Sequence, residues 1–131
     1  MSVPPSAGAL EDAALAERFP WLRATERPAA ARLEAQEGIR LTENPVRGGA
    51  DALWNLDSST TARVDVMGVP EAYKPGNWSE DFLDSIGRHA RNHDFTAIDL
   101  TGASESRIYQ IMEKVYSLPP VQQGGIIYVG W

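Results

Sequence analysis

The chain has 131 residues, a formal net charge of −6 and no cysteine. This length suits one compact domain, and a hydrophobic content of 43% with four tryptophans indicates a folded core. The lack of cysteine excludes disulfides, thiolate metal ligands and a cysteine nucleophile. The acidic balance argues against a broad nucleic-acid-binding surface, because affinity for phosphate comes mainly from lysine and arginine.

The N-terminal segment is expected to lie outside the folded domain. Residues 1–20 are rich in alanine and proline and are interpreted as a linker or tail, with a short helix from Leu10 to Phe19. This segment has no basic n-region and no apolar h-region, so no secretory signal is expected. No apolar run approaches the ~20 residues of a membrane span. Residues 21–131 are therefore expected to form the domain.

Hydrophobic periodicity predicts the elements of this domain in chain order. A helix from Glu26 to Glu37 begins after Thr25 as its N-cap and ends at Gly38. Two later helices begin after Ser79 and Ser104. The predicted strands are residues 39–42, 50–56, 62–69, 95–100 and 126–129. Because strand–helix–strand crossovers pair strands in parallel, the order α-β-β-β-α-β-α-β predicts a single α/β domain with a mixed central sheet flanked by helices.

Acidic residues fall at three junctions in the first half of this domain. Glu26 opens the first helix, Asp51 enters the second strand, and Asp65 lies inside the third strand between Val64 and Val66. Three carboxylates at one edge of a sheet can hold a hard divalent cation through oxygen, and such ions promote phosphodiester chemistry. The sequence therefore predicts a metal site at these three acids.

Each acid also has an ordinary structural interpretation. Asp51 follows two glycines and suits a turn, and Asp65 can face solvent on an edge strand. Glu26 can be a first-turn acid that favours the helix dipole. Asp99, at the end of a strand that is expected to pair in parallel, is either a second candidate site or a cap or turn acid before the next helix.

Basic and imidazole side chains gather near the end of the helix that follows Ser79. Arg88, His89 and Arg91 are candidates for binding nucleic acid. His89 or His93 is a candidate general base if the target is RNA and its ribose 2′-hydroxyl attacks without a metal. The same side chains can equally form a solvated helix end, where the dipole favours positive charge.

The order of these elements and acids resembles the PD-(D/E)XK nuclease fold. The segments that carry the resemblance are ERPAAARLEAQEG, ENPVRGGADALWN, ARVDVMG and IGRHARNHDFTAIDLTG. More narrowly, the chain resembles the C-terminal toxin domains of bacterial contact-dependent growth-inhibition effectors and related polymorphic toxins, many of which cut tRNA. The resemblance covers about residues 25–130.

The resemblance implies a role for each acid. Glu26 would match the helix glutamate of the family, with Glu34 or Glu37 as alternatives. Asp51 would match the first strand aspartate, and Asp65 the acid of the (D/E)XK element.

The chain departs from the family at the motif lysine. Met67 stands at that position. Lys74, Arg88 or Arg91 would have to replace it, and Lys74 is the candidate for catalysis.

The resemblance also implies a function. It implies a metal-dependent endonuclease with Mg²⁺ as the expected cofactor and RNA, in particular tRNA, as the expected substrate. It further implies a toxin domain of a larger secreted effector, which acts in the cytoplasm of a target cell and binds a cognate immunity protein. Two alternatives remain open. The charge of −6 suits an acidic, non-enzymatic immunity or binding protein, and Met67 suits a catalytically inactive nuclease-like domain.

Overall fold

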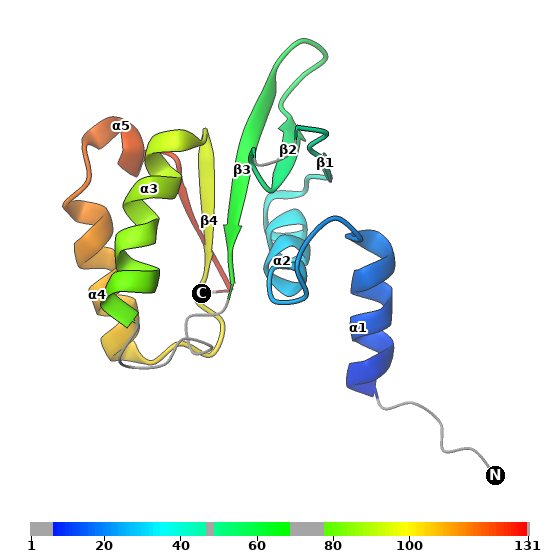
Figure 1. The fold of residues 1–131 in the computed structure, drawn as a ribbon, viewed down its shortest axis with the longest axis horizontal. Helices are drawn as coiled ribbons and strands as arrows, with labels where there is room; N and C mark the ends of the chain where they lie inside the picture. Colours follow the sequence, from blue (N-terminus) through cyan, green and yellow to red (C-terminus); the bar gives the residue numbers. More distant parts are fainter. Residues whose placement is uncertain (1–6, 47–48, 69–77, 131) are drawn as a thin grey trace.

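The computed structural model describes residues 7–46, 49–68 and 78–130. They form a single mixed α/β domain with a five-stranded sheet, as predicted (Figure 1). The elements in chain order are α1 (Ala7–Arg18), α2 (Arg27–Glu37), β1 (Leu41–Glu43), β2 (Ala52–Asn55), β3 (Thr61–Met67), the π-helical turn η3 (Trp78–Leu83), α3 (Asp84–Asn92), β4 (Phe95–Asp99), α4 (Glu105–Tyr116), α5 (Pro120–Gln123) and β5 (Ile126–Val129).

The ends of two helices differ from the predicted ones. The residue before α2 is Glu26, whose side chain makes no capping hydrogen bond, so the predicted N-cap at Thr25 is wrong. Gly38 ends α2 in the left-handed conformation with φ 65°, as its position predicts. The predicted helix start at Ser79 falls inside η3, and α3 itself begins at Asp84.

The sheet has the strand order β1-β2-β3-β4-β5. The first three strands pair antiparallel, whereas β3, β4 and β5 pair in parallel. Parallel pairing follows from the helical connections, because α3 joins β3 to β4 and α4 joins β4 to β5. The third strand is therefore central and lies between an antiparallel neighbour and a parallel one.

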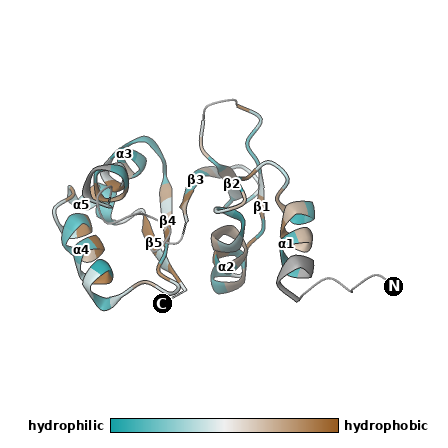
Figure 2. Cartoon of the chain, turned by 60° about the horizontal axis from the view of Figure 1, so that its bottom comes forward, coloured by the Kyte–Doolittle hydropathy of each residue, from teal (hydrophilic) through white to brown (hydrophobic). Residues whose placement is uncertain are grey.

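Helices cover both faces of the sheet. Figure 1 shows α2 on one face, with α1 on its outer side, and α3, α4 and α5 on the other face. Figure 2 shows that β4 and β5 are largely hydrophobic, whereas α3 and α4 carry both hydrophilic and hydrophobic positions. In the described part of the chain, no helix has both the length and the apolar character that crossing a bilayer requires.

The alternation of side chains along β3 divides the core into two parts. Val64 and Val66 lie on the face that α2 covers, where they form a first buried cluster with Leu33 of that helix. Met67 lies on the other face, where it packs with η3, α3 and α4 in the second cluster. Because successive residues of a strand point to opposite faces, Asp65 must share the α3 face with Met67. The position where the family has lysine is thus a buried core position in this chain.

Candidate functional site

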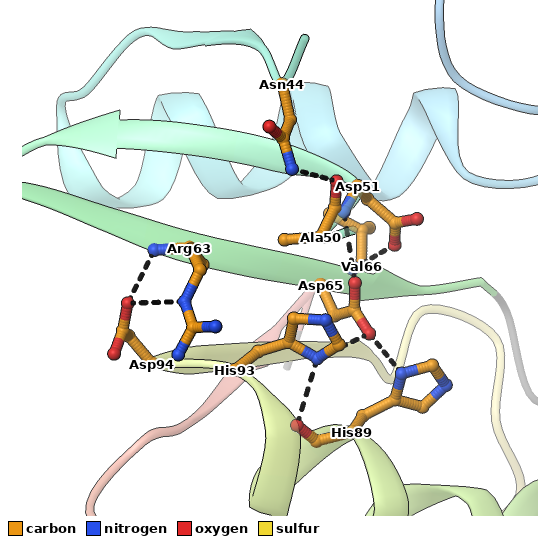
Figure 3. Close-up of polar contacts among 9 residues, drawn as sticks. All are labelled: Asn44, Ala50, Asp51, Arg63, Asp65, Val66, His89, His93 and Asp94. Carbon is orange, nitrogen blue, oxygen red and sulfur yellow. Dashed lines mark hydrogen bonds and ion pairs between the residues drawn. The ribbon is translucent and has the colours of Figure 1, made fainter. Parts of the chain in front are cut away.

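Strand pairing brings Asp51 beside Asp65. Ala52 pairs with Val64 in the register of β2 and β3, so the preceding Asp51 lies next to Asp65. The N–H of Asp51 donates to Asp65 Oδ1 at 3.1 Å, and the N–H of Val66 donates to Asp51 Oδ2 at 2.8 Å. These two predicted site residues are therefore held together by the hydrogen bonds of the strand pair (Figure 3).

The backbone leading into Asp51 is fixed as well. The side-chain amide of Asn44 donates to the carbonyl of Ala50 at 3.0 Å. The indole N–H of Trp21 donates to the carbonyl of Asp51 at 3.1 Å. Asp51 is therefore a positioned side chain at the start of β2.

A cavity of about 490 Å³ opens beside Asp51. Glu26, Asp51 and Asp81 bring carboxylates to its wall, and Arg23 and Arg88 bring cations. Asp65 lies behind Asp51 and is only 3% exposed. The residues that line the cavity are Arg23, Thr25, Glu26, Asp51, Val66, Met67, Gly68, Asp81, Ser85, Arg88 and His89.

Both histidines of the chain lie beside Asp65. His89 Nδ1 contacts Asp65 Oδ2, and His93 Nδ1 lies 3.0 Å from the same oxygen (Figure 3). The end of α3 is fixed there, because the N–H of Asp94 donates to the carbonyl of Arg63 in β3 at 3.1 Å. The interpretation of these histidines as a solvated helix end is therefore wrong, and so is that of Asp65 as a solvent-facing residue of an edge strand. Their spacing of one helical turn was the available sequence signal.

The charges in this cluster perturb one another. Burial raises the pKa of Asp51 to about 7, and the carboxylates of Asp65 and Glu26 add to the increase, against the effect of a backbone hydrogen bond. Burial would also raise the pKa of Asp65, but the hydrogen bond and the charge of His89 hold it below its ordinary value. The pKa of His89 is raised, mainly by this hydrogen bond. The contact therefore favours an ionised Asp65 and a protonated His89, while the raised pKa leaves Asp51 only partly ionised near neutral pH.

The predicted glutamates differ in whether they reach the cavity. Glu26 lies on the cavity wall, where its Oε1 accepts the N–H of Arg23 at 2.9 Å. Glu34 instead pairs with Arg18 and accepts the N–H of Leu41 at 2.6 Å. Among the glutamates of this helix region, Glu26 is the one that lines the cavity.

The predicted basic residues also differ in whether they reach the cavity. Arg88 lines the cavity, whereas Arg91 is exposed on α3 and does not. Lys74 falls in residues 69–77, outside the described residues. Arg23 was not predicted, because its place at the cavity depends on the turn before α2. Its spacing of three residues from Glu26 was the available signal.

Asp99 lies on the opposite face of the sheet, toward α2. It is fully buried, and its Oδ2 pairs with Arg32 at 2.5 Å. Its Oδ1 accepts the N–H of Thr101 at 2.9 Å. The carboxylate thus anchors α2 to β4 and stabilises the turn after the strand, in agreement with its interpretation as a turn acid, whereas Ser104 is the N-cap of α4.

Two kinds of cation site can be distinguished by their donors. Asp51 and Glu26 supply carboxylates at one cavity, where burial and the neighbouring carboxylates raise the pKa of Asp51, and a divalent cation would favour its ionised form. This donor set fits a hard ion such as Mg²⁺. Asp65 is engaged differently, since Oδ1 accepts an amide and Oδ2 meets two imidazoles.

The fold and this cluster define a small mixed α/β domain with a cavity lined by carboxylates and arginines. No family model and no curated protein sequence matches the chain. Among solved structures, the chain is similar to the CdiA-CT toxin from Burkholderia pseudomallei E479, determined in complex with its cognate CdiI immunity protein. The two chains are 26% identical and superpose with a TM-score of 0.66, over 82% of this chain and 99% of the other. This similarity supports the interpretation of the chain as a bacterial competition toxin.

Proposed function

We propose that this domain is a nuclease toxin that cleaves RNA, with tRNA as its substrate class, at the cavity lined by Glu26 and Asp51. The observation that carries the proposal is the cavity that brings Asp51, a carboxylate with a raised pKa, together with further carboxylates and two arginines. Perturbed acids in a cavity are typical of catalytic sites. The similarity to a CdiA-CT toxin supports the toxin part, and the resemblance to PD-(D/E)XK nucleases supports the reaction.

In this proposal Asp51 and Glu26 hold a divalent cation, and Asp65 supports Asp51 from behind through its hydrogen bond to the backbone. An ion held there would supply Lewis-acid polarisation of a phosphodiester oxygen and would lower the pKa of a bound water. Asp51 is positioned for this role before substrate arrives, because hydrogen bonds to its backbone and its carboxylate fix it.

Arg88 and Arg23 take the role of the missing motif lysine. Both line the same cavity as the two carboxylates. A guanidinium group binds phosphate oxygens and stabilises the negative charge that develops in the transition state. Two arginines at the cavity also offset locally the net charge of −6, which disfavours RNA binding elsewhere.

The contact between His89 and Asp65 favours a second mechanism for the same function. In that mechanism, the unprotonated form of His89 takes the proton of a ribose 2′-hydroxyl while the 2′-oxygen attacks the adjacent phosphorus and the 5′-oxygen leaves. Asp65 orients the imidazole and stabilises its protonated form. The side chain of His89 is 37% exposed and lines the cavity, so substrate can reach it.

The proposal extends to delivery and partner. As a toxin, the chain would act as part of a larger secreted effector and reach the cytoplasm of a target cell. A cognate immunity protein would bind it and block the cavity, in line with the complex in which the similar toxin was solved.

The test uses the purified chain and total tRNA, with Mg²⁺ in one reaction and EDTA in the other. We expect cleavage with Mg²⁺, a loss of activity with EDTA, and a loss of about 10²-fold or more in Asp51→Asn. Glu37→Gln is the control for removal of a carboxylate, since Glu37 is exposed at the C-terminal end of α2 and does not line the cavity. Cleavage that survives EDTA but is lost in His89→Gln would replace the metal mechanism by the histidine mechanism. Intact tRNA with the unaltered chain in both buffers would overturn the nuclease proposal.

A further inference from the structure

The two histidines of the chain converge on one oxygen atom. The sequence contains two histidines in total, and both Nδ1 atoms face Asp65 Oδ2. Among the described residues, Asp65, His89 and His93 can bring three ligand atoms within 4.8 Å of one another. They come from two elements, since Asp65 lies in β3 and the histidines stand one turn apart at the end of α3 (Figure 3).

The surroundings of this oxygen are buried. The side chain of Asp65 is 4% exposed, that of His93 15% and that of His89 37%. A buried carboxylate between two imidazoles is costly unless it is paired, so this arrangement requires a positive charge, from either a proton or a metal ion.

A second observation points to the same place. Thr96 pairs with Asp65 in the register of β3 and β4, so the two side chains share the α3 face of the sheet. Thr96 is 1% exposed, and its hydroxyl finds no hydrogen-bond partner within the described part of the chain. Because buried hydroxyl groups are nearly always hydrogen-bonded, the Thr96 hydroxyl beside Asp65 is expected to bind a further polar group, such as a water molecule on a metal ion.

We propose that Asp65, His89 and His93 form a binding site for a transition-metal cation of the Zn²⁺ class. Two imidazole nitrogens and one carboxylate oxygen are donors that Zn²⁺, Ni²⁺ and Fe²⁺ accept, whereas Mg²⁺ prefers oxygen alone. A Zn²⁺ ion lies about 2.0–2.2 Å from such donors, so ligand atoms grouped this closely can share one ion after small side-chain shifts. The site differs in donor type from the carboxylates of Asp51 and Glu26.

In the metal-free protein, protons on the imidazoles satisfy the atoms that would otherwise bind a metal ion. His93 Nδ1 also lies 3.1 Å from the carbonyl oxygen of His89, so it carries a proton there. A bound cation would take the place of that proton and of the contact between His89 and Asp65. It would thereby link the end of α3 to β3 through all three ligands.

The test uses the chain without a histidine tag and Zn²⁺ or Co²⁺ as the probe. Because the chain has no cysteine and only these two histidines, imidazole ligation in its Co²⁺ absorption spectrum must come from this site. We expect binding of one cation, and a loss of affinity of at least about tenfold in His93→Gln and in His89→Gln. Arg91→Gln, an exposed change on the same helix, is the matched control and should bind as the unaltered chain does.

Two further readouts separate this site from the proposed catalytic one. Titration with Zn²⁺ should shift the imidazole ¹⁵N resonances of both histidines and raise the melting temperature, whether or not the chain cleaves tRNA. Asp51→Asn should reduce Zn²⁺ affinity far less than His93→Gln does, because it leaves all three ligands in place. Zn²⁺ binding that is lost in Asp51→Asn but kept in His93→Gln would overturn the proposal and assign the cation to the carboxylates. Absence of imidazole ligation at a tenfold excess of Co²⁺ would also overturn it.

Discussion

Asp51 and Asp65 are linked through the backbone of β2 and β3. Asp51 donates its N–H to Asp65 at 3.1 Å, while its own carboxylate accepts the N–H of Val66 at 2.8 Å. The hydrogen bonds that position both carboxylates also hold two like charges near each other. Burial is the main cause that raises the pKa of Asp51 to about 7, and the nearby charge of Asp65 adds to the increase. Burial of these carboxylates lowers the free energy of unfolding, and this loss of stability can be measured.

The first prediction concerns Asp51→Asn. A carboxyl whose folded pKa is raised from 3.8 to about 7 costs stability as pH rises through this window, because the folded state resists ionisation that the unfolded chain accepts. Asparagine removes the charge and keeps an oxygen for the N–H of Val66. In EDTA at about pH 8.5, we expect the variant to melt higher by about 4 °C or more. The gain should shrink near pH 4, and a lower melting temperature at the alkaline pH would contradict the account.

The second prediction concerns the pair of Asp65 and His89. The lowered pKa of Asp65 gives stability that is present above its ordinary value of 3.8 and is lost as pH falls through the folded value. The raised pKa of His89 gives stability that is present below 6.5 and is lost as pH rises through the folded value. His89→Gln should therefore lower the free energy of unfolding most between the ordinary pKa of the Asp65 carboxyl, 3.8, and the ordinary pKa of the His89 imidazole, 6.5. Urea denaturation at about pH 5.5 and pH 9 checks this, and an equal loss at both would contradict it.

The third prediction separates the two arginines on α3. Arg88→Gln should reduce tRNA cleavage by about 10²-fold, because Arg88 lines the cavity and would stabilise transition-state charge. Arg91→Gln, which removes the same charge three residues away, should retain the activity. Single-turnover rates under matched salt provide the comparison. Equal losses in both variants would mean that these arginines act only through general electrostatic attraction.

The fourth prediction concerns the anchor between α2 and β4. Arg32→Leu leaves the fully buried carboxylate of Asp99 without its ion pair, so we expect the free energy of unfolding to fall by about 3 kcal/mol. Chemical denaturation measures this loss. At a temperature where the variant stays folded, tRNA cleavage should be unchanged, because Asp99 faces away from the cavity. A selective loss of cleavage would instead restore Asp99 as a second site.

The sequence predicted the mixed α/β class because the hydrophobic periods of its strands and helices are local properties. It also predicted the neighbourhood of Asp51 and Asp65, since both lie in consecutive, hairpin-linked strands. The histidine cluster was harder to predict. His89 and His93 meet Asp65 only because the end of α3 is hydrogen-bonded to Arg63 and because Ile86 packs α3 onto the sheet. That geometry depends on tertiary packing.

Arg23 and Met67 illustrate the same limit. The cavity position of Arg23 is set by the turn before α2, which the helix pattern does not define. Met67 reads in sequence as a missing lysine, but in the fold it is a core residue beneath η3 and α3. The loss of the motif lysine is therefore accompanied by an apolar contact at its position and by arginines at the cavity.

The most direct test of the central claim is the state of the tRNA pool in bacteria that express the unaltered chain or Asp51→Asn without any immunity protein. The account predicts growth arrest and degraded tRNA with the unaltered chain. It predicts normal growth and intact tRNA with the variant at an equal level of folded protein. Normal growth with both chains, or degraded tRNA with both, would contradict the assignment of the Asp51 cavity as the active site of a nuclease toxin.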